Sequence, residues 1–177
     1  MVSRYRLTPL LLALLASPAF AAASNAALPA GATSIQEGYE DWRVACAQQG
    51  QATQCSMSQQ QLQQNGQMVL AIELTKSDAG ASGNLVLPFG LDLSQGAVLQ
   101  IDDGAPLPLQ AFKTCLPVGC IVPVSFDAAT LDGLGKGKVL KISVAASDTE
   151  HKTTFGVSLK GFISAFNRIT ALSSEPN

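Results

Sequence analysis

The stretch "KVLKISVAASDTEHKTTFGVSLK", Lys138–Lys160, contains two runs in which apolar and polar residues alternate. In the first run one side consists of Leu140, Ile142, Val144 and Ala146. In the second run the corresponding side consists of Thr153, Phe155, Val157 and Leu159. Successive side chains of a strand point to opposite faces, so this period of two predicts strands that are buried on one face. The polar residues between the runs predict a turn.

The same period recurs earlier in the chain. It is found in "YEDWRVAC" (39–46) and in "QMVLAIELT" (67–75). The dipeptides Asn65-Gly66 and Asp103-Gly104 are typical of the turns that join antiparallel strands. Together these signals indicate about eight strands at hairpin-like spacing. They predict an all-β fold, either an antiparallel β-sandwich or a small barrel.

Two segments are expected to be helical. "FDAATLDGLGKG" (126–137) offers Asp127 as a helix cap, and its glycines limit it to one or two turns. "GFISAFNRITAL" (161–172) has apolar residues at helical spacing. The apolar positions are Phe162, Ala165, Phe166, Ile169 and Leu172. We expect this C-terminal helix to cover an open end or face of the sandwich.

The N-terminus has the pattern of a secretory signal peptide. Arg4 and Arg6 precede a short apolar run, and Ala21, Ala22 and Ala23 form the expected cleavage region. An uncleaved membrane anchor is the alternative. We therefore predict a signal peptide over 1–23, a flexible leader over 24–37, one β domain over 38–172 and a tail over 173–177.

The charge balance argues against two classes of partner. Removal of Arg4 and Arg6 takes the formal net charge from −2 to about −4, and no basic block remains. Nucleic acids and anionic membranes both attract clustered Lys and Arg. Neither is expected as a partner, and no integral membrane span is expected after signal cleavage.

The four cysteines are expected to form two disulfides, as is usual in a small exported domain. Cys46 and Cys55 would link a hairpin, and Cys115 and Cys120 would close the loop "TCLPVGC". Crossed pairings remain open because the sequence does not place the strands. A redox dithiol requires C-x-x-C, and zinc prefers paired short knuckles. The spacings here are C-x8-C and C-x4-C, so no metal or cofactor is expected.

The segment from Gln48 to Gln67 contains ten glutamines. The simplest interpretation is a solvated face or an exposed edge. A candidate ligand surface for a glycan or a protein consists of Tyr39, Trp42, Gln59, Gln61 and Gln63. The period of the preceding strand places Trp42 with Val44 and Cys46, which favours a core position for the indole.

Few residues could support catalysis. His151 is the one histidine of the chain, and it lies in a polar turn near Ser147, Asp148 and Glu150. No serine has the surroundings of a nucleophile elbow. The adjacent Asp102 and Asp103 would point to opposite faces, so we assign them to a turn. No catalytic residue is predicted.

Four blocks of the sequence resemble the invasion-associated locus B family of exported bacterial proteins. They are "YEDWRVAC…QCSMSQ", "LPFGLDLSQGAVLQIDDG", "FKTCLPVGC" and "SLKGFISAFNRI", and the resemblance extends from Gly38 to Ala171. It implies a β-rich domain in the periplasm, with outer-membrane association or secretion as alternatives. It also implies disulfides at the four cysteines and a link to host-cell invasion.

We therefore expect a non-enzymatic, disulfide-stabilised binding protein of the bacterial cell envelope. Its partner would be a protein or another envelope component. Two alternatives belong to other classes. One is a periplasmic hydrolase that uses His151, and the other is a small-ligand carrier with an apolar cavity between the sheets.

Overall fold

The computed structural model describes residues 28–50, 52–148 and 151–173. The predicted signal peptide lies outside this part of the chain. The strands are β1 (Ser34–Tyr39), β2 (Trp42–Gln49), β3 (Ala52–Leu62), β4 (Met68–Ser77), β5 (Gly80–Leu87), β6 (Ala97–Ile101), β7 (Thr114–Leu116), β8 (Gly119–Asp127), β9 (Val139–Ala145) and β10 (Lys152–Ser158). The helices are α1 (Ala128–Lys136) and α2 (Phe162–Leu172), with short 3₁₀ turns η1 (Pro29–Gly31) and η2 (Leu93–Gln95).

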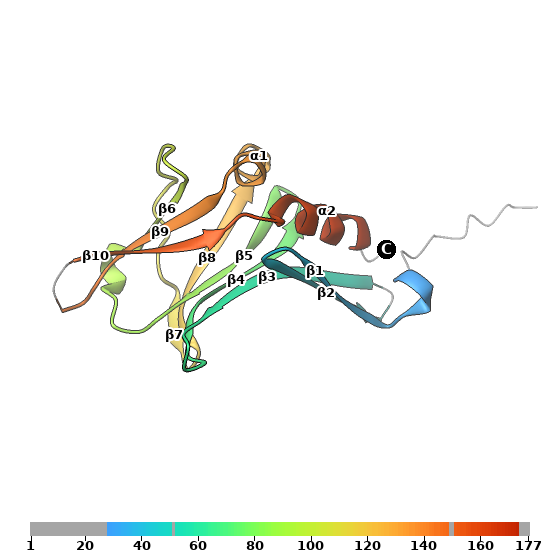
Figure 1. The fold of residues 1–177 in the computed structure, drawn as a ribbon, viewed down its shortest axis with the longest axis horizontal. Helices are drawn as coiled ribbons and strands as arrows, with labels where there is room; N and C mark the ends of the chain where they lie inside the picture. The colour runs from blue at the N-terminus through green and yellow to red at the C-terminus, as the bar shows by residue number, and fades with distance from the viewer. Residues whose placement is uncertain (1–27, 51, 149–150, 174–177) are drawn as a thin grey trace, which may run out of the picture.

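The strands form two antiparallel sheets. The larger sheet has seven strands in the order β1-β2-β3-β4-β5-β8-β7, and the smaller has the order β10-β9-β6. Figure 1 shows α2 beside the end of the large sheet that carries β1 and β2, and the small sheet toward the other end. The mainly antiparallel β fold with a short helix and a C-terminal helix is confirmed. The sheets remain open, so the barrel alternative is wrong.

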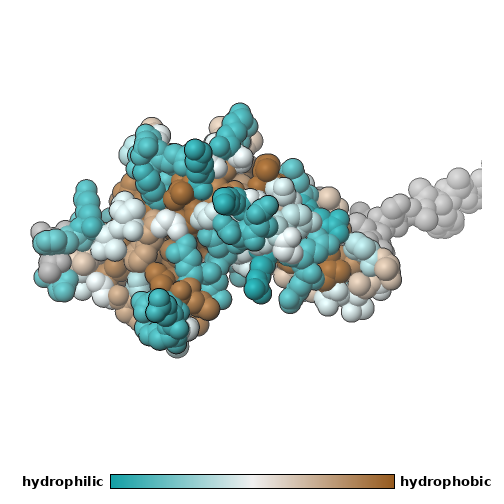
Figure 2. All heavy atoms as spheres, viewed as in Figure 1, coloured by the Kyte–Doolittle hydropathy of each residue, from teal (hydrophilic) through white to brown (hydrophobic). Residues whose placement is uncertain are grey.

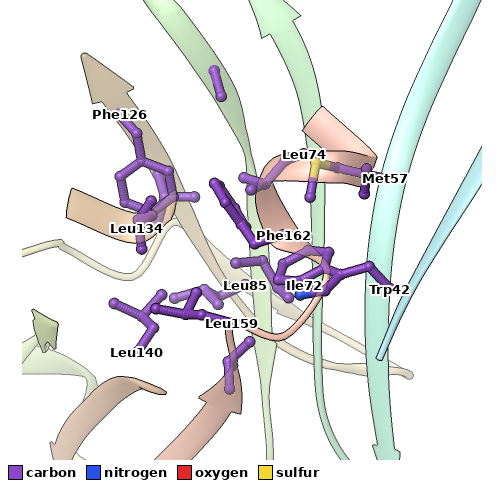
Figure 3. Close-up of a cluster of buried hydrophobic side chains, with 14 of the residues drawn as sticks. Trp42, Met57, Ile72, Leu74, Leu85, Phe126, Leu134, Leu140, Leu159 and Phe162 are labelled. Carbon is purple, nitrogen blue, oxygen red and sulfur yellow. The ribbon is translucent and has the colours of Figure 1, made fainter. Parts of the chain in front are cut away.

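One face of the large sheet forms most of the core. The register places Val44 opposite Met57 and Met57 opposite Leu74, and all three side chains are buried. Leu140 and Phe162 bring the small sheet and α2 into the same cluster (Figure 3). Hydrophobic side chains also reach the surface, notably beside the polar tip at the bottom of the view (Figure 2). The two sheets and α2 thus share one hydrophobic core.

The start of α2 is fixed by close contact with β1. Gly161 has a φ of +79°, and a Cβ there would lie 2.1 Å from the carbonyl oxygen of Tyr39. Only glycine fits this position without strain. The next residue, Phe162, packs edge-to-face on Trp42 with ring centroids 5.2 Å apart. The glycine therefore allows α2 to pack its apolar face on β2 and β3.

The ordered domain begins earlier in the chain than we predicted. Leu28 is buried in the core, and β1 pairs with β2 from Ser34 onward. Residues 28–37 are thus part of the fold and not a flexible leader. The polar Glu37 interrupts the apolar alternation between Ile35 and Tyr39, which hides this strand in the sequence.

Two strands differ in extent from their sequence patterns. The alternating pattern of 39–46 covers only part of β2, which continues to Gln49, so Cys46 lies inside the strand. The segment after Asp103-Gly104 returns beside β6, where Leu107 N–H donates to the carbonyl of Leu99 over 2.7 Å. That segment makes isolated bridges and not a full strand, because its prolines remove ladder donors.

Candidate functional site

A groove crosses the solvent-facing side of the large sheet, opposite the core. Its first part is a hollow of about 850 Å³ over β1, β2 and β3. The register puts Gly38, Arg43 and Ser58 in one row across these strands and Gln36 and Ala45 in the next. Because glycine, alanine and serine are small, the floor of the hollow lies close to the backbone.

A second hollow of about 380 Å³ continues the first along the sheet. It shares Gln36 and Ala45 with the first hollow and extends over β3 to Glu73 and Thr75 of β4. We call the two together the outer-face groove. It runs across β1–β4, and its walls carry amides, hydroxyls and a few charges. Such a surface offers many hydrogen-bonding groups beside a small-residue floor.

Carboxylates outnumber cations in the lining of the groove. Arg43 lines it together with four carboxylates, Glu37, Glu40, Asp41 and Glu73, of which Glu37 is paired with Arg168. The balance favours a ligand that is neutral or weakly basic. Within the described residues, no three His, Cys, Asp or Glu side chains gather in a geometry that could hold a metal ion.

The five residues of the predicted ligand surface do not share one exposed face. Trp42 is 1% exposed, and its indole N–H donates to the carbonyl of Ser158 over 2.9 Å. Gln59 is also buried, at 7% exposed. Gln61 donates from Nε2 to the carbonyl of Gly156. Trp42 and Gln59 are thus buried and bonded to Ser158, whereas Gln61 is half-buried and makes its bond at the surface.

Gln59 joins the two sheets through both ends of its amide. Its Nε2 donates to the carbonyl of Ser158 over 2.9 Å, and its Oε1 accepts from Ser158 N–H over 3.1 Å. Ser158 ends β10, which is an edge strand of the small sheet. The glutamine amide replaces a neighbouring strand there, because it satisfies one donor and one acceptor of the edge backbone.

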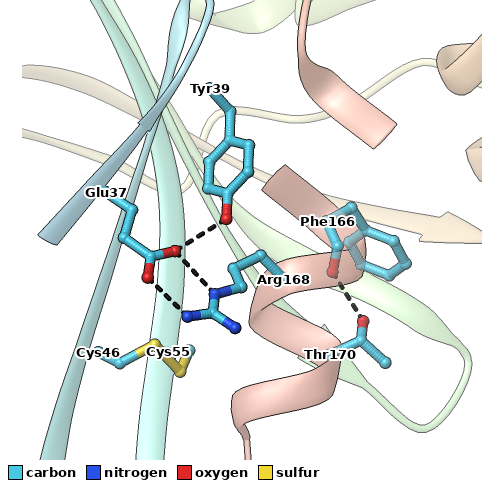
Figure 4. The surroundings of a disulfide bond; sticks show 7 residues. All are labelled: Glu37, Tyr39, Cys46, Cys55, Phe166, Arg168 and Thr170. Carbon is cyan, nitrogen blue, oxygen red and sulfur yellow. Dashed lines mark hydrogen bonds and ion pairs between the residues drawn. A yellow bond between two sulfur atoms is a disulfide. The ribbon is translucent and has the colours of Figure 1, made fainter. Parts of the chain in front are cut away.

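Tyr39 and Gln63 are placed differently. Gln63 lies in the β3–β4 turn, where its backbone N–H donates to the carbonyl of Gln67. The half-buried Tyr39 donates from its hydroxyl to Glu37 Oε2 over 2.8 Å. Arg168 of α2 donates to the same carboxylate from Nε and Nη2, over 2.7 and 2.6 Å (Figure 4).

The Arg168 hydrogen bonds are the main reason why the pKa of Glu37 lies below its ordinary value. Burial raises the pKa of Tyr39, and its bond to Glu37 adds to this effect. The cluster fixes α2 to β1 on the core side of the sheet. Arg168 does not line the outer-face groove, because it lies on the other side of the strands that form the floor of the groove.

The structure pairs all four cysteines. Cys46 and Cys55 are direct cross-strand partners in β2 and β3, and Cys115 and Cys120 are partners in β7 and β8. These are the two local links named in the sequence analysis, and the crossed pairings that the sequence left open do not occur. The first disulfide lies under the outer-face groove and close to Arg168 (Figure 4). It therefore holds together the two strands that form the floor of the groove.

His151 lies away from the groove. It is exposed just before β10, and its carbonyl accepts a hydrogen bond from Ala146 N–H. Glu150, one carboxylate of the hydrolase hypothesis, lies outside the described residues. Ser147 donates from its backbone to the carbonyl of Gly90. Ser147 and His151 therefore lie on either side of the β9–β10 turn, and neither lines the outer-face groove.

The sequence alone did not reveal the groove. In β2 and β3 the floor residues, such as Ala45 and Ser58, alternate with core residues. This alternation identifies the solvent-facing side of the strands in the sequence. The missing element is β1, most of which falls within the predicted leader over 24–37. A concave surface also depends on the twist of the sheet, which residue patterns do not give.

Comparison with known proteins identifies the family. The model of the Invasion associated locus B (IalB) protein family matches residues 42–170. The chain belongs to this family. An invasion protein B homologue of Brucella abortus (strain 2308) is 46% identical over 150 residues, which cover 84% of this chain and 86% of the relative. Invasion protein B of Bartonella bacilliformis is 36% identical over 158 residues, 88% of this chain and 85% of the relative.

A solved structure of an IalB family member supports the same fold. The crystal structure of invasion associated protein B from Bartonella henselae matches with a TM-score of 0.73 at 34% identity, over 78% of this chain and 96% of the other. The relatives are named as invasion proteins and not as enzymes. Together with the two disulfides, membership of the IalB family indicates an exported, envelope-associated protein. In the described part of the chain, neither helix is long and apolar enough to cross a membrane.

Proposed function

We propose that this protein is a non-enzymatic binding protein of the bacterial cell envelope, and that the outer-face groove is its ligand surface. The observation that carries the proposal is the shape and composition of the groove. Small residues such as Ala45 and Ser58 form a floor on a sheet that a disulfide holds in place. A preformed surface loses little free energy to ordering when a ligand binds.

We infer that the ligand is an extended segment of another envelope protein. The groove runs beside β1, which is an edge strand of the large sheet in the described residues. An extended segment can hydrogen-bond to an exposed sheet edge while its side chains enter adjacent hollows. The amides of Gln36 and Gln60 would add side-chain hydrogen bonds, and the surplus of carboxylates favours a neutral or basic segment.

The proposed compartment is the periplasm, reached through cleavage of the signal peptide over 1–23. Disulfides form and persist there. The hollows of the outer-face groove are open and polar, and the sheets pack directly on each other around Leu85 and Leu140 (Figure 3). No observation favours the carrier or the hydrolase over the binding function.

The test is to block the floor of the groove without disturbing the core. Ala45→Arg places a long side chain in the groove, and Ser125→Arg places the same side chain on the same sheet face, on β8. Each protein, purified after export, is used to capture partners from an envelope extract of the producing bacterium. We expect a partner that Ser125→Arg retains and Ala45→Arg loses. Equal capture by both variants would contradict the proposal.

A further inference from the structure

Part of one end of the large sheet, from β3 to β8, contains no charged residue, whereas the β1–β2 turn at the same end carries Glu40 and Asp41. Three stretches lack Asp, Glu, Lys, Arg and His altogether: residues 44–72, 79–91 and 114–126. They include the β3–β4 turn, the end of β5 and the β7–β8 turn. We call the region formed by residues 62–67, 87–90 and 116–119 the uncharged end.

The topology brings these three segments to the same end of the sheet. β3 runs toward this end and finishes at Leu62, and β4 runs back from it. β5 also runs toward this end, where Leu87 pairs with Cys120 at the start of β8. β7 and β8 turn there, with Leu116 opposite Gly119. The β3–β4 turn and β7 both lie at the lower tip of the view in Figure 1.

Large apolar side chains protrude from this end. Leu62, Phe89, Leu116 and Val118 are between 49% and 62% exposed. They are four of the seven large hydrophobic residues that are exposed in the described part of the chain. Exposed apolar groups that gather in one place mark an interaction surface more often than isolated ones do.

The tip that carries Leu116 and Val118 is held rigidly. The Cys115–Cys120 disulfide closes the turn. Gly119 has a φ of +138°, and a Cβ there would lie 2.5 Å from the carbonyl oxygen of Leu87. The turn thus packs tightly on the end of β5, which carries Phe89 two residues later. The disulfide and this close contact therefore support the exposed positions of Leu116 and Val118.

We propose that the uncharged end docks on a lipid surface by inserting these side chains between neutral headgroups. Charges are costly to bring into a bilayer, and the three segments of the uncharged end contain none. The side chains project from turns, so they can insert between lipid headgroups. The backbone of the turns can remain hydrated at the level of the headgroups. Four partly exposed side chains are too few for the roughly 1,200 Å² that a specific protein interface buries, which argues against a second copy as the occupant.

The outer-face groove reaches Leu62, where Glu40, Asp41 and Arg43 also line it. The test therefore uses Phe89 and Leu116, which do not line the groove. The exported protein is sedimented with vesicles of phosphatidylcholine, with and without phosphatidylglycerol, at low and high salt. We expect binding to neutral vesicles that salt does not weaken, because no cation takes part. The double variant Phe89→Ser with Leu116→Ser should weaken this binding at least about tenfold.

Leu109→Ser is the matched control, because Leu109 is 60% exposed but lies between β6 and β7. It should bind vesicles as the unaltered protein does, and so should the groove variant Ala45→Arg. Three results would overturn the proposal: no binding to neutral vesicles, equal loss in the Leu109 variant, or binding only to phosphatidylglycerol that salt abolishes. A fourth contradicting result would come from light scattering after gel filtration: a dimer for the unaltered protein and a monomer for the double variant.

Discussion

Arg168 of α2 donates two hydrogen bonds to the carboxylate of Glu37 in β1, across 131 positions of sequence. The pair joins the last helix to the first strand of the large sheet. Both side chains are 30% exposed, so solvent still reaches the pair and limits its contribution to stability. Its main effect is on the position of α2 over β1 and β2.

Glu37→Gln should lower the stability of the protein at neutral pH and have less effect in acid. The folded pKa of Glu37 lies below its ordinary value of 4.5, so the carboxylate contributes stability above that value. The contribution is lost as the pH falls through the folded pKa. Urea unfolding of the two proteins should therefore give midpoints that converge below about pH 4.5. Lys136→Ala is a control, since its partner Asp132 is more exposed and lies in the same helix. A pH-independent difference would contradict this account.

Gln59→Ala should destabilise the protein by about 1–3 kcal/mol, because the Ser158 N–H loses its acceptor and the Ser158 carbonyl keeps only the Trp42 indole as a donor. The neighbouring Gln60 is exposed on the opposite face, and its amide contacts only the sulfur of Met68 among the bonds described. Gln60→Ala should change the free energy of unfolding by less than about 0.5 kcal/mol. Equal effects of the two changes, measured by urea unfolding, would show that Gln59 does not join the sheets.

Gly161→Ala should cost at least about 2 kcal/mol or prevent folding, because the added Cβ meets the carbonyl of Tyr39 in a backbone conformation with positive φ. Gly38→Ala is the control, since a Cβ at Gly38 meets no atom within 4 Å. Thermal unfolding of both variants tests this. A Gly161 variant as stable as the Gly38 variant would mean that α2 does not begin against β1 as described.

Loss of the first disulfide should destabilise the protein more than loss of the second. Each short link should contribute about 2–3 kcal/mol by restricting the unfolded chain. Cys46 and Cys55 are also buried, whereas Cys115 is exposed. Denaturant unfolding of the two double Cys→Ala variants should therefore show a larger loss in the free energy of unfolding for the Cys46 and Cys55 variant. The reverse order would argue that the groove floor does not depend on its disulfide.

Period-two alternation identified the fold class and most strands, because burial on one face of a sheet is a local pattern. β9 and β10 follow the alternation of Ile142 and Val157, and the apolar spacing of α2 reflects its contact with the core. The first strand was missed because Glu37 occupies a core-side position. At that position Glu37 is stabilised by hydrogen bonds from Tyr39 and from Arg168, which comes from the far end of the chain.

The roles of the glutamines could not be predicted from their own segment. Gln59 and Gln60 are adjacent and identical, yet one joins two sheets and the other faces the groove. The difference depends on the position of β10, which is distant in sequence. The groove likewise depends on the shape of four paired strands, so composition indicated a polar hairpin but not a concave surface.

The most direct test of the central claim is site-specific photo-crosslinking in the producing bacterium. A photoreactive amino acid replaces Gln60 in the groove or Ser125 on the same sheet face outside it. The account predicts a discrete adduct with an envelope protein from position 60, no such adduct from position 125, and loss of the adduct when Ala45→Arg is added. The same adduct from both positions, or from neither, would contradict the outer-face groove as the ligand surface.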